Sequence, residues 1–163
     1  STHCISSAAS DVYKRQAMPE SWMELLRKFG GEYGAATGRP RRVGPFDAVA
    51  SRYGLKCQNA DKIALTKLDV LSMMKEIPVI VGYKKGNQEV TDFDPIEDLE
   101  EYVPIVRMLP GWQTDISGCV TYDELPDAAK TYVETLEDLL QHEIQFISVG
   151  AERSQYLTKG EWL

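Results

Sequence analysis

The chain has 163 residues, the length of one ordinary domain, and 43% of its residues are hydrophobic. This composition is typical of globular proteins and excludes the disordered, collagen-like and disulfide-scaffold classes. The net charge of −7 disfavours a general nucleic-acid binder, because affinity for phosphate backbones needs clustered basic side chains.

We divide the chain into an N-terminal arm and a domain that begins at residue 17. Residues 1–16 are rich in Ser and Ala, lack a sustained apolar period and are interpreted as a non-native or disordered arm, which leaves 17–163 as the domain. Helices are predicted at 20–29, 46–54 and 126–142. Strands are predicted at 62–66, 77–83 and 144–149, with an edge strand at 89–91, and the prolines within 92–118 predict an irregular segment. Long connections between the three main strands favour one α/β sheet over a sandwich.

The cysteines and the apolar runs indicate the compartment. Three widely spaced cysteines without a CxxC pair favour a reducing, cytoplasmic setting over a disulfide framework or a zinc site. No apolar run approaches the roughly 20 residues that a bilayer-spanning helix needs, so no membrane partner is expected.

The net charge conceals two unlike halves. Residues 1–85 hold 14 basic and 8 acidic side chains, whereas residues 86–144 hold 2 basic and 15 acidic. The acidic stretch contains no clear pair of carboxylates for acid–base chemistry and is interpreted as a solvated face. The basic half is therefore the place to look for an anion site.

An arginine-rich loop, Thr37-Gly-Arg-Pro-Arg-Arg42, follows the first predicted helix. Arg presents a planar fork that binds carboxylates and phosphates through two hydrogen bonds. Glycine lets the backbone approach a ligand closely. The loop is a candidate anion site, and the alternative is a solvated basic turn.

Two short segments come directly after predicted strands. Thr66-Lys-Leu-Asp69 is similar to the element with which GTP-binding proteins read guanine. Its carboxylate can accept from the ring N–H and from the exocyclic amine, a donor pair that adenine lacks. Ser148-Val-Gly-Ala-Glu-Arg153 places a glycine at the carboxyl end of a strand, where α/β sheets bind ligands. The alternatives are two surface charges and a routine strand exit.

Taken together, these segments closely resemble the C-terminal part of adenylosuccinate synthetase. The resemblance extends from about residue 20 to the mid-150s, and its motifs keep the order and spacing of the family. They are Gly31-Glu-Tyr-Gly-Ala-Ala-Thr-Gly-Arg-Pro-Arg-Arg42, Phe46-Asp-Ala-Val-Ala50, Ala64-Leu-Thr-Lys-Leu-Asp-Val-Leu71, Leu109-Pro-Gly-Trp112, Glu124-Leu-Pro126 and Ser148-Val-Gly150.

The resemblance implies a fold and an activity. The fold is an α/β, partial P-loop-NTPase-like sheet with parallel strands and flanking helices. The activity is that of a GTP-dependent ligase that joins IMP and L-aspartate to adenylosuccinate in AMP biosynthesis. The family uses Mg²⁺, takes GTP as co-substrate and forms cytoplasmic homodimers.

The resemblance also assigns binding residues. The aspartate and IMP loop is Ala35, Ala36, Thr37, Gly38, Arg39, Pro40 and Arg41. The GTP-binding residues are Arg41, Lys67, Leu68, Asp69, Ser148, Val149 and Gly150. Three positions depart from the family, since Ala36 replaces a second Thr, Pro45 replaces a Trp, and Ala151 replaces a Pro.

The family's catalytic residues have no counterpart here. The sequence contains no Gly-Asp-Glu-Gly-Lys-Gly run, so it supplies neither the phosphate loop with its catalytic Asp nor the catalytic His that follows, and no metal ligand is assigned. We therefore expect a C-terminal fragment that is inactive alone. The alternatives are a stand-alone guanine-nucleotide or anion-binding module without catalysis, and a degraded remnant.

Overall fold

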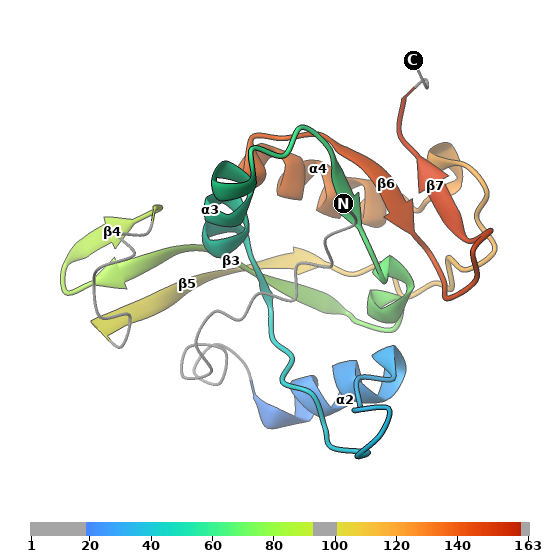
Figure 1. Ribbon diagram of the computed structural model, residues 1–163, viewed down its shortest axis with the longest axis horizontal. Helices are drawn as coiled ribbons and strands as arrows, with labels where there is room; N and C mark the ends of the chain where they lie inside the picture. The colour runs from blue at the N-terminus through green and yellow to red at the C-terminus, as the bar shows by residue number, and fades with distance from the viewer. Residues whose placement is uncertain (1–18, 93–100, 161–163) are drawn as a thin grey trace.

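The structure, a computed structural model, describes residues 19–92 and 101–160 (Figure 1). The predicted arm at 1–16 lies outside these residues. The helices are α2 (Glu20–Gly30), α3 (Ala48–Gln58) and α4 (Asp127–Leu140), with short 3-10 helices η1 (Leu68–Leu71) and η3 (Tyr122–Glu124). The strands are β1 (Phe46–Asp47), β2 (Ile63–Leu65), β3 (Glu76–Lys85), β4 (Gln88–Val90), β5 (Tyr102–Pro110), β6 (Ile144–Ser148) and β7 (Tyr156–Thr158).

The strands form two sheets of mixed direction rather than one parallel sheet. In the first sheet, β3 runs parallel to β1 and antiparallel to β4 and β5. In the second sheet, β2 runs parallel to β6, and β7 is antiparallel to β6. The prediction that the three main strands share one sheet is therefore wrong. The apolar run in β3 arises because both of its faces are buried, which says nothing about the direction of its neighbours.

The prediction that residues 92–118 are irregular is wrong in its middle part. Nine of these residues form β5, which pairs along the length of β3. Pro104 lies opposite Tyr83, and Pro110 lies opposite Glu76. Within the described chain β5 pairs with β3 alone, and an edge strand accommodates proline because the missing N–H leaves no ladder bond broken.

The three predicted helices are confirmed, with shifted ends. Helix α2 ends at Gly30 and is followed by the cap residue Gly31, whose positive φ of 59° suits glycine. Helix α3 begins two residues later than predicted because Phe46 and Asp47 first pair with β3. The Asp47 side chain then accepts a hydrogen bond from the Ala50 N–H at 2.9 Å, which caps the helix. Helix α3 continues past Gly54 to Gln58, and the cap residue Asn59 then adopts the left-handed conformation.

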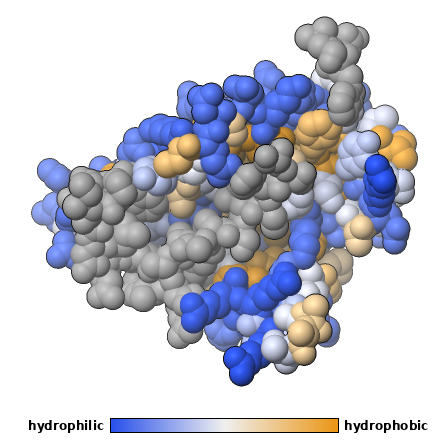
Figure 2. Space-filling view, viewed as in Figure 1, coloured by the Kyte–Doolittle hydropathy of each residue, from blue (hydrophilic) through white to orange (hydrophobic). Residues whose placement is uncertain are grey.

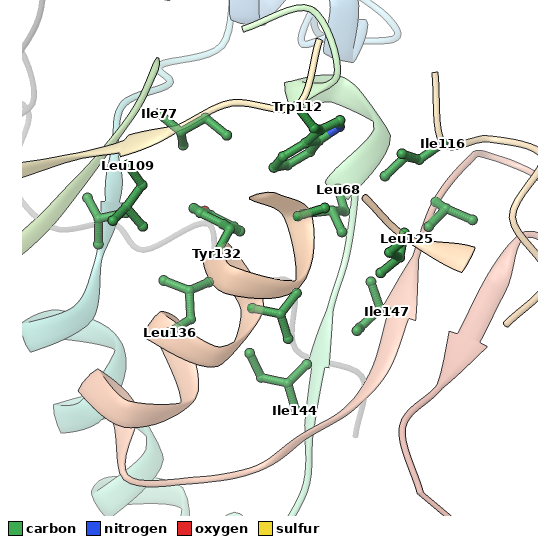
Figure 3. Packing of buried hydrophobic residues seen from close by; sticks show 14 of the residues in the cluster. Leu68, Ile77, Leu109, Trp112, Ile116, Leu125, Tyr132, Leu136, Ile144 and Ile147 are labelled. Atoms are coloured by element: carbon green, nitrogen blue, oxygen red, sulfur yellow. The ribbon is translucent and has the colours of Figure 1, made fainter. Parts of the chain in front are cut away.

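One hydrophobic core joins both sheets to α4. Tyr132 and Leu136 of α4 point into the same cluster as Ile144 and Ile147 of β6 (Figure 3). The Tyr132 ring lies against that of Trp112, with centroids 6.1 Å apart. The Trp112 N–H donates to the Ser72 hydroxyl at 3.2 Å, beside the end of η1. The core thus fixes the segment that follows β2.

Leu136→Ala is expected to lower the free energy of unfolding by about 2–5 kcal/mol, because Leu136 is fully buried and leaves a cavity. Leu25→Ala is the matched control, since Leu25 is an exposed leucine on α2. Urea unfolding followed by circular dichroism measures both effects. Equal losses in the two variants would contradict this description of the core.

Candidate functional site

A pocket of about 330 Å³ lies between α2, the end of the arginine loop and strand β2. Its polar lining includes Glu32, Arg41 and Lys67, and apolar side chains such as Leu26 and Phe46 form its walls. Apolar surface is visible between the α2 segment at the bottom of Figure 2 and the sheets above it. Pro45 is buried and lines the same pocket.

The arginine loop has a closed base and an exposed tip. Backbone bonds join the Arg41 N–H to the Glu32 carbonyl at 2.9 Å and the Gly34 N–H to the Arg39 carbonyl at 2.8 Å. Gly38 adopts a positive φ of 64°, and its N–H reaches the Gly34 carbonyl at 2.7 Å. Residues 35–40 are exposed, so the side chains of Thr37 and Arg39 are open to solvent.

The Thr66-Lys-Leu-Asp69 segment leaves the carboxyl end of β2. Lys67 turns the chain with a positive φ of 62°, and the buried Leu68 side chain anchors the turn in the core. Asp69 is half-buried, and within the described chain its Oδ1 has no hydrogen-bond partner. Burial raises the pKa of Asp69, although its backbone hydrogen bonds and the charge of Lys67 oppose this effect. The segment therefore holds a carboxylate with one buried acceptor that no described donor satisfies.

The Ser148–Gly150 segment lies beside it. Leu65 of β2 pairs in parallel with Ile147 of β6, so the chain leaves both strands at the same edge of the sheet. Val149 is buried, and the Ser148 hydroxyl donates to the Gly150 carbonyl at 2.9 Å. The structure thus brings together two of the three segments that the sequence assigned to the site.

Glu32 joins the arginine loop to the Thr66-Lys-Leu-Asp69 segment. Its carboxylate accepts from the Arg41 guanidinium at 3.2 Å and forms an ion pair with the Lys67 ammonium. The Lys67 ammonium also donates to the Gly30 carbonyl at 3.0 Å. Partial burial works to raise the pKa of Glu32, but the hydrogen bonds and charges of Lys67 and Arg41 outweigh it and leave the pKa below its usual value. Arg41 and Lys67 therefore meet at one carboxylate, while the tip at 35–40 does not line the pocket.

Three residues around this site were assigned no role from the sequence. Glu32 lay inside a recognised motif without an assigned partner. Gln155 packs over Gly150, where an added Cβ would lie 2.2 Å from its Oε1, and its amide donates to the Ser117 carbonyl at 3.0 Å. The charge of Asp115 contributes to the raised pKa of Asp69. The only sequence signal for Asp115 was the Asp115-x-Ser117 pattern, which is typical of a turn in which the Asp side chain accepts from the backbone.

Two further features are absent from residues 19–92 and 101–160. Three or more His, Cys, Asp or Glu side chains do not come together anywhere in these residues in a way that could hold a metal ion. Nor do these residues contain a helix that combines the length and the apolar character needed to cross a membrane.

Comparison with known proteins gives consistent matches. The family model described as adenylosuccinate synthetase matches residues 11–157. Adenylosuccinate synthetase from Trichlorobacter lovleyi is 47% identical over 133 residues, which cover 81% of this chain and 31% of the relative. The enzyme from Thermomicrobium roseum is 45% identical over 137 residues, covering 82% and 31%.

A solved structure gives the same result for the fold. The fully ligated adenylosuccinate synthetase from Plasmodium falciparum matches with a TM-score of 0.80 and 40% identity, covering 88% of this chain and 35% of that one. The mixed α/β arrangement of parallel and antiparallel strands is therefore shared. The chain spans about a third of the length of the relatives it matches.

Asp69→Asn is expected to raise the free energy of unfolding at pH 7, because burial disfavours the charged carboxylate. The pKa of Asp69 is higher in the folded than in the unfolded state, so the stability it contributes is present at low pH and lost as the pH rises through the folded pKa. The gain from Asn should therefore shrink as the pH falls below about 4. Denaturant unfolding at several pH values tests this, with Asp61→Asn, an exposed site, as the control. A gain independent of pH would contradict it.

Proposed function

Because the chain belongs to the adenylosuccinate synthetase family, we propose that it is the C-terminal part of a GTP-dependent ligase that joins IMP and L-aspartate to adenylosuccinate in AMP biosynthesis. One observation carries the proposal beyond the family. The arginine loop and the guanine-reading segment are joined at the Glu32 carboxylate. This contact supports the proposal, because Arg41 would lie between the aspartate and GTP sites and Lys67 belongs to the segment that would read guanine.

The guanine site of this proposal is built on Asp69. We assign the N–H donors of guanine to its Oδ1, which is buried and lacks a hydrogen-bond partner among the described residues. Leu68 holds the turn in the core, and Ser148, Val149 and Gly150 line the other side of the base. The Lys67 ammonium is already bound to the Gly30 carbonyl and Glu32, so its role is to brace the segment.

The aspartate and IMP site is the loop Ala35–Arg41. The forks of Arg39 and Arg41 suit the carboxylates of L-aspartate, with Arg39 beside IMP and Arg41 between the aspartate and GTP sites. Thr37 supplies a hydroxyl, while Ala36 supplies none. The Thr37 hydroxyl also accepts a bond from the Arg39 N–H at 3.4 Å, which supports the tip of the loop.

The chemistry itself needs groups from outside the 163 residues. In the proposed reaction the 6-oxygen of IMP is phosphorylated by GTP, and the aspartate amine then displaces that phosphate. Among the described residues, no three His, Cys, Asp or Glu side chains come together in a way that could hold the Mg²⁺ that the family uses. The P-loop-like sheet, the homodimer and the cytoplasmic location belong to the same proposal.

The 163-residue chain is expected to bind GDP in preference to IDP, which lacks the exocyclic amine, and to ADP. Asp69→Asn should weaken GDP binding by about 10–100-fold, because a hydrogen bond to a charged group contributes about 1.5–3 kcal/mol. Isothermal titration calorimetry measures the three affinities. Asp61→Asn, an exposed site, should change none of them, and an unchanged preference in Asp69→Asn would contradict the assignment of Asp69.

The chain alone should form no adenylosuccinate from IMP, L-aspartate, GTP and Mg²⁺. Chromatography of the reaction mixture measures the product, with the Trichlorobacter lovleyi enzyme as the positive control. Turnover by a clean preparation would show that the catalytic groups lie within this chain. GDP binding without turnover, from a gene that starts near Met18, would favour the stand-alone module instead.

A further inference from the structure

The carboxylate of Glu32 is held in place by the end of helix α2. Gly31 turns the chain after the helix, and the Glu32 N–H returns to the Arg27 carbonyl at 2.9 Å. The side chain is only 19% exposed, against 57% for Arg41 and 48% for Lys67. Of the three charged groups, the carboxylate is thus the least exposed.

Both cations are also tied to α2 by other bonds. The Lys67 ammonium donates to the Gly30 carbonyl at 3.0 Å. The Arg41 carbonyl accepts from the Arg27 side chain at 3.0 Å, and the Arg41 N–H donates to the Glu32 carbonyl. One helix end therefore sets the positions of two loops that lie 26 residues apart in the sequence.

We propose that Glu32 is a positioning residue that couples the arginine loop to the guanine-reading segment, so that a guanine nucleotide and a dicarboxylate strengthen each other's binding. This inference rests on the proposed function, since it needs both sites in one chain. Glu32 touches neither ligand and acts through Arg41 and Lys67.

The coupling follows from sharing one carboxylate between two cations. Without its charge, Arg41 and Lys67 would repel each other, and the turn at Lys67 would lose its link to the loop. A nucleotide that fixes the segment around Asp69 also fixes Lys67, then Glu32 and Arg41, which lowers the ordering cost for a second ligand. The effect must be reciprocal, because coupling free energy belongs to the pair of sites.

The effect of Glu32 on the stability of the fold can be separated from its effect on ligand coupling. Arg41 and Lys67 are about half exposed, and such surface pairs contribute little to stability. Glu32→Gln should therefore leave the unfolding transition nearly unchanged. A change in ligand coupling would then report positioning and not loss of fold.

The first experiment needs no ligand. Lys67→Met should shift the backbone amide resonances of residues 34–41 in two-dimensional NMR, and the same substitution in a Glu32→Gln background should not. Lys62→Met is the control. It replaces an exposed lysine just before strand β2 and should leave the resonances of residues 34–41 unchanged. The proposal would be overturned if the resonances of residues 34–41 did not respond to Lys67→Met, or if they responded equally in the Glu32→Gln background.

The second experiment measures the coupling itself. GDP affinity is determined by calorimetry with and without saturating L-aspartate in the wild-type chain, Glu32→Gln and the control Glu24→Gln, an exposed glutamate on α2. We expect L-aspartate to tighten GDP binding about 5-fold or more in the wild type and in Glu24→Gln, and to have no effect in Glu32→Gln. Equal coupling in all three chains would overturn the proposal. Absence of GDP binding in the wild type would contradict the proposed nucleotide site, and the amide shifts would still decide whether Glu32 connects the loops.

Discussion

The parallel pairing of β2 with β6 is the contact on which the rest of the site depends. The two strands are separated by nearly eighty residues, and helix α4 covers both through Tyr132, Leu136 and Leu140. Burying each such side chain contributes about 1.5–3 kcal/mol, so the pairing is held by the core and not by the loops. Because the strands end at the same edge, the segments around Asp69 and Val149 meet without needing a direct bond between them.

Local charge, and not net charge, decides what this surface can bind. The chain is acidic overall, yet Arg41 and Lys67 stand together beside the pocket because a single carboxylate, Glu32, separates them. Asp69 shows the converse, since its charge is kept in a half-buried place where burial raises its pKa. Such a half-buried charge fits the recognition role proposed for Asp69, because binding sites keep groups that packing alone would replace.

The sequence predicted the elements whose signal is local. The apolar runs at 62–66 and 144–149 gave β2 and β6, and the helical spacing in 126–142 gave α4. Strand β5 was missed because Pro104 and Pro110 argue against a strand unless it is known to lie at an edge. The division into two sheets, the hydrogen bond from Gln155 to Ser117 and the ion pair of Glu32 with Lys67 were missed for one reason. Each depends on a partner far along the chain, which composition and periodicity do not identify. The roles of Thr37, Arg39 and the guanine-site residues stay predictions.

The guanine side and the arginine side of the proposed site differ in how far each is preorganised before a ligand binds. The guanine side rests on buried anchors, Leu68 and Val149, so its geometry is set before any ligand arrives. The arginine side has a closed base but an exposed tip at 35–40, whose side chains must be ordered when a ligand binds. Because the Glu32 carboxylate links the guanine side to the arginine side, the first ligand to bind lowers the cost of ordering the loop for the second.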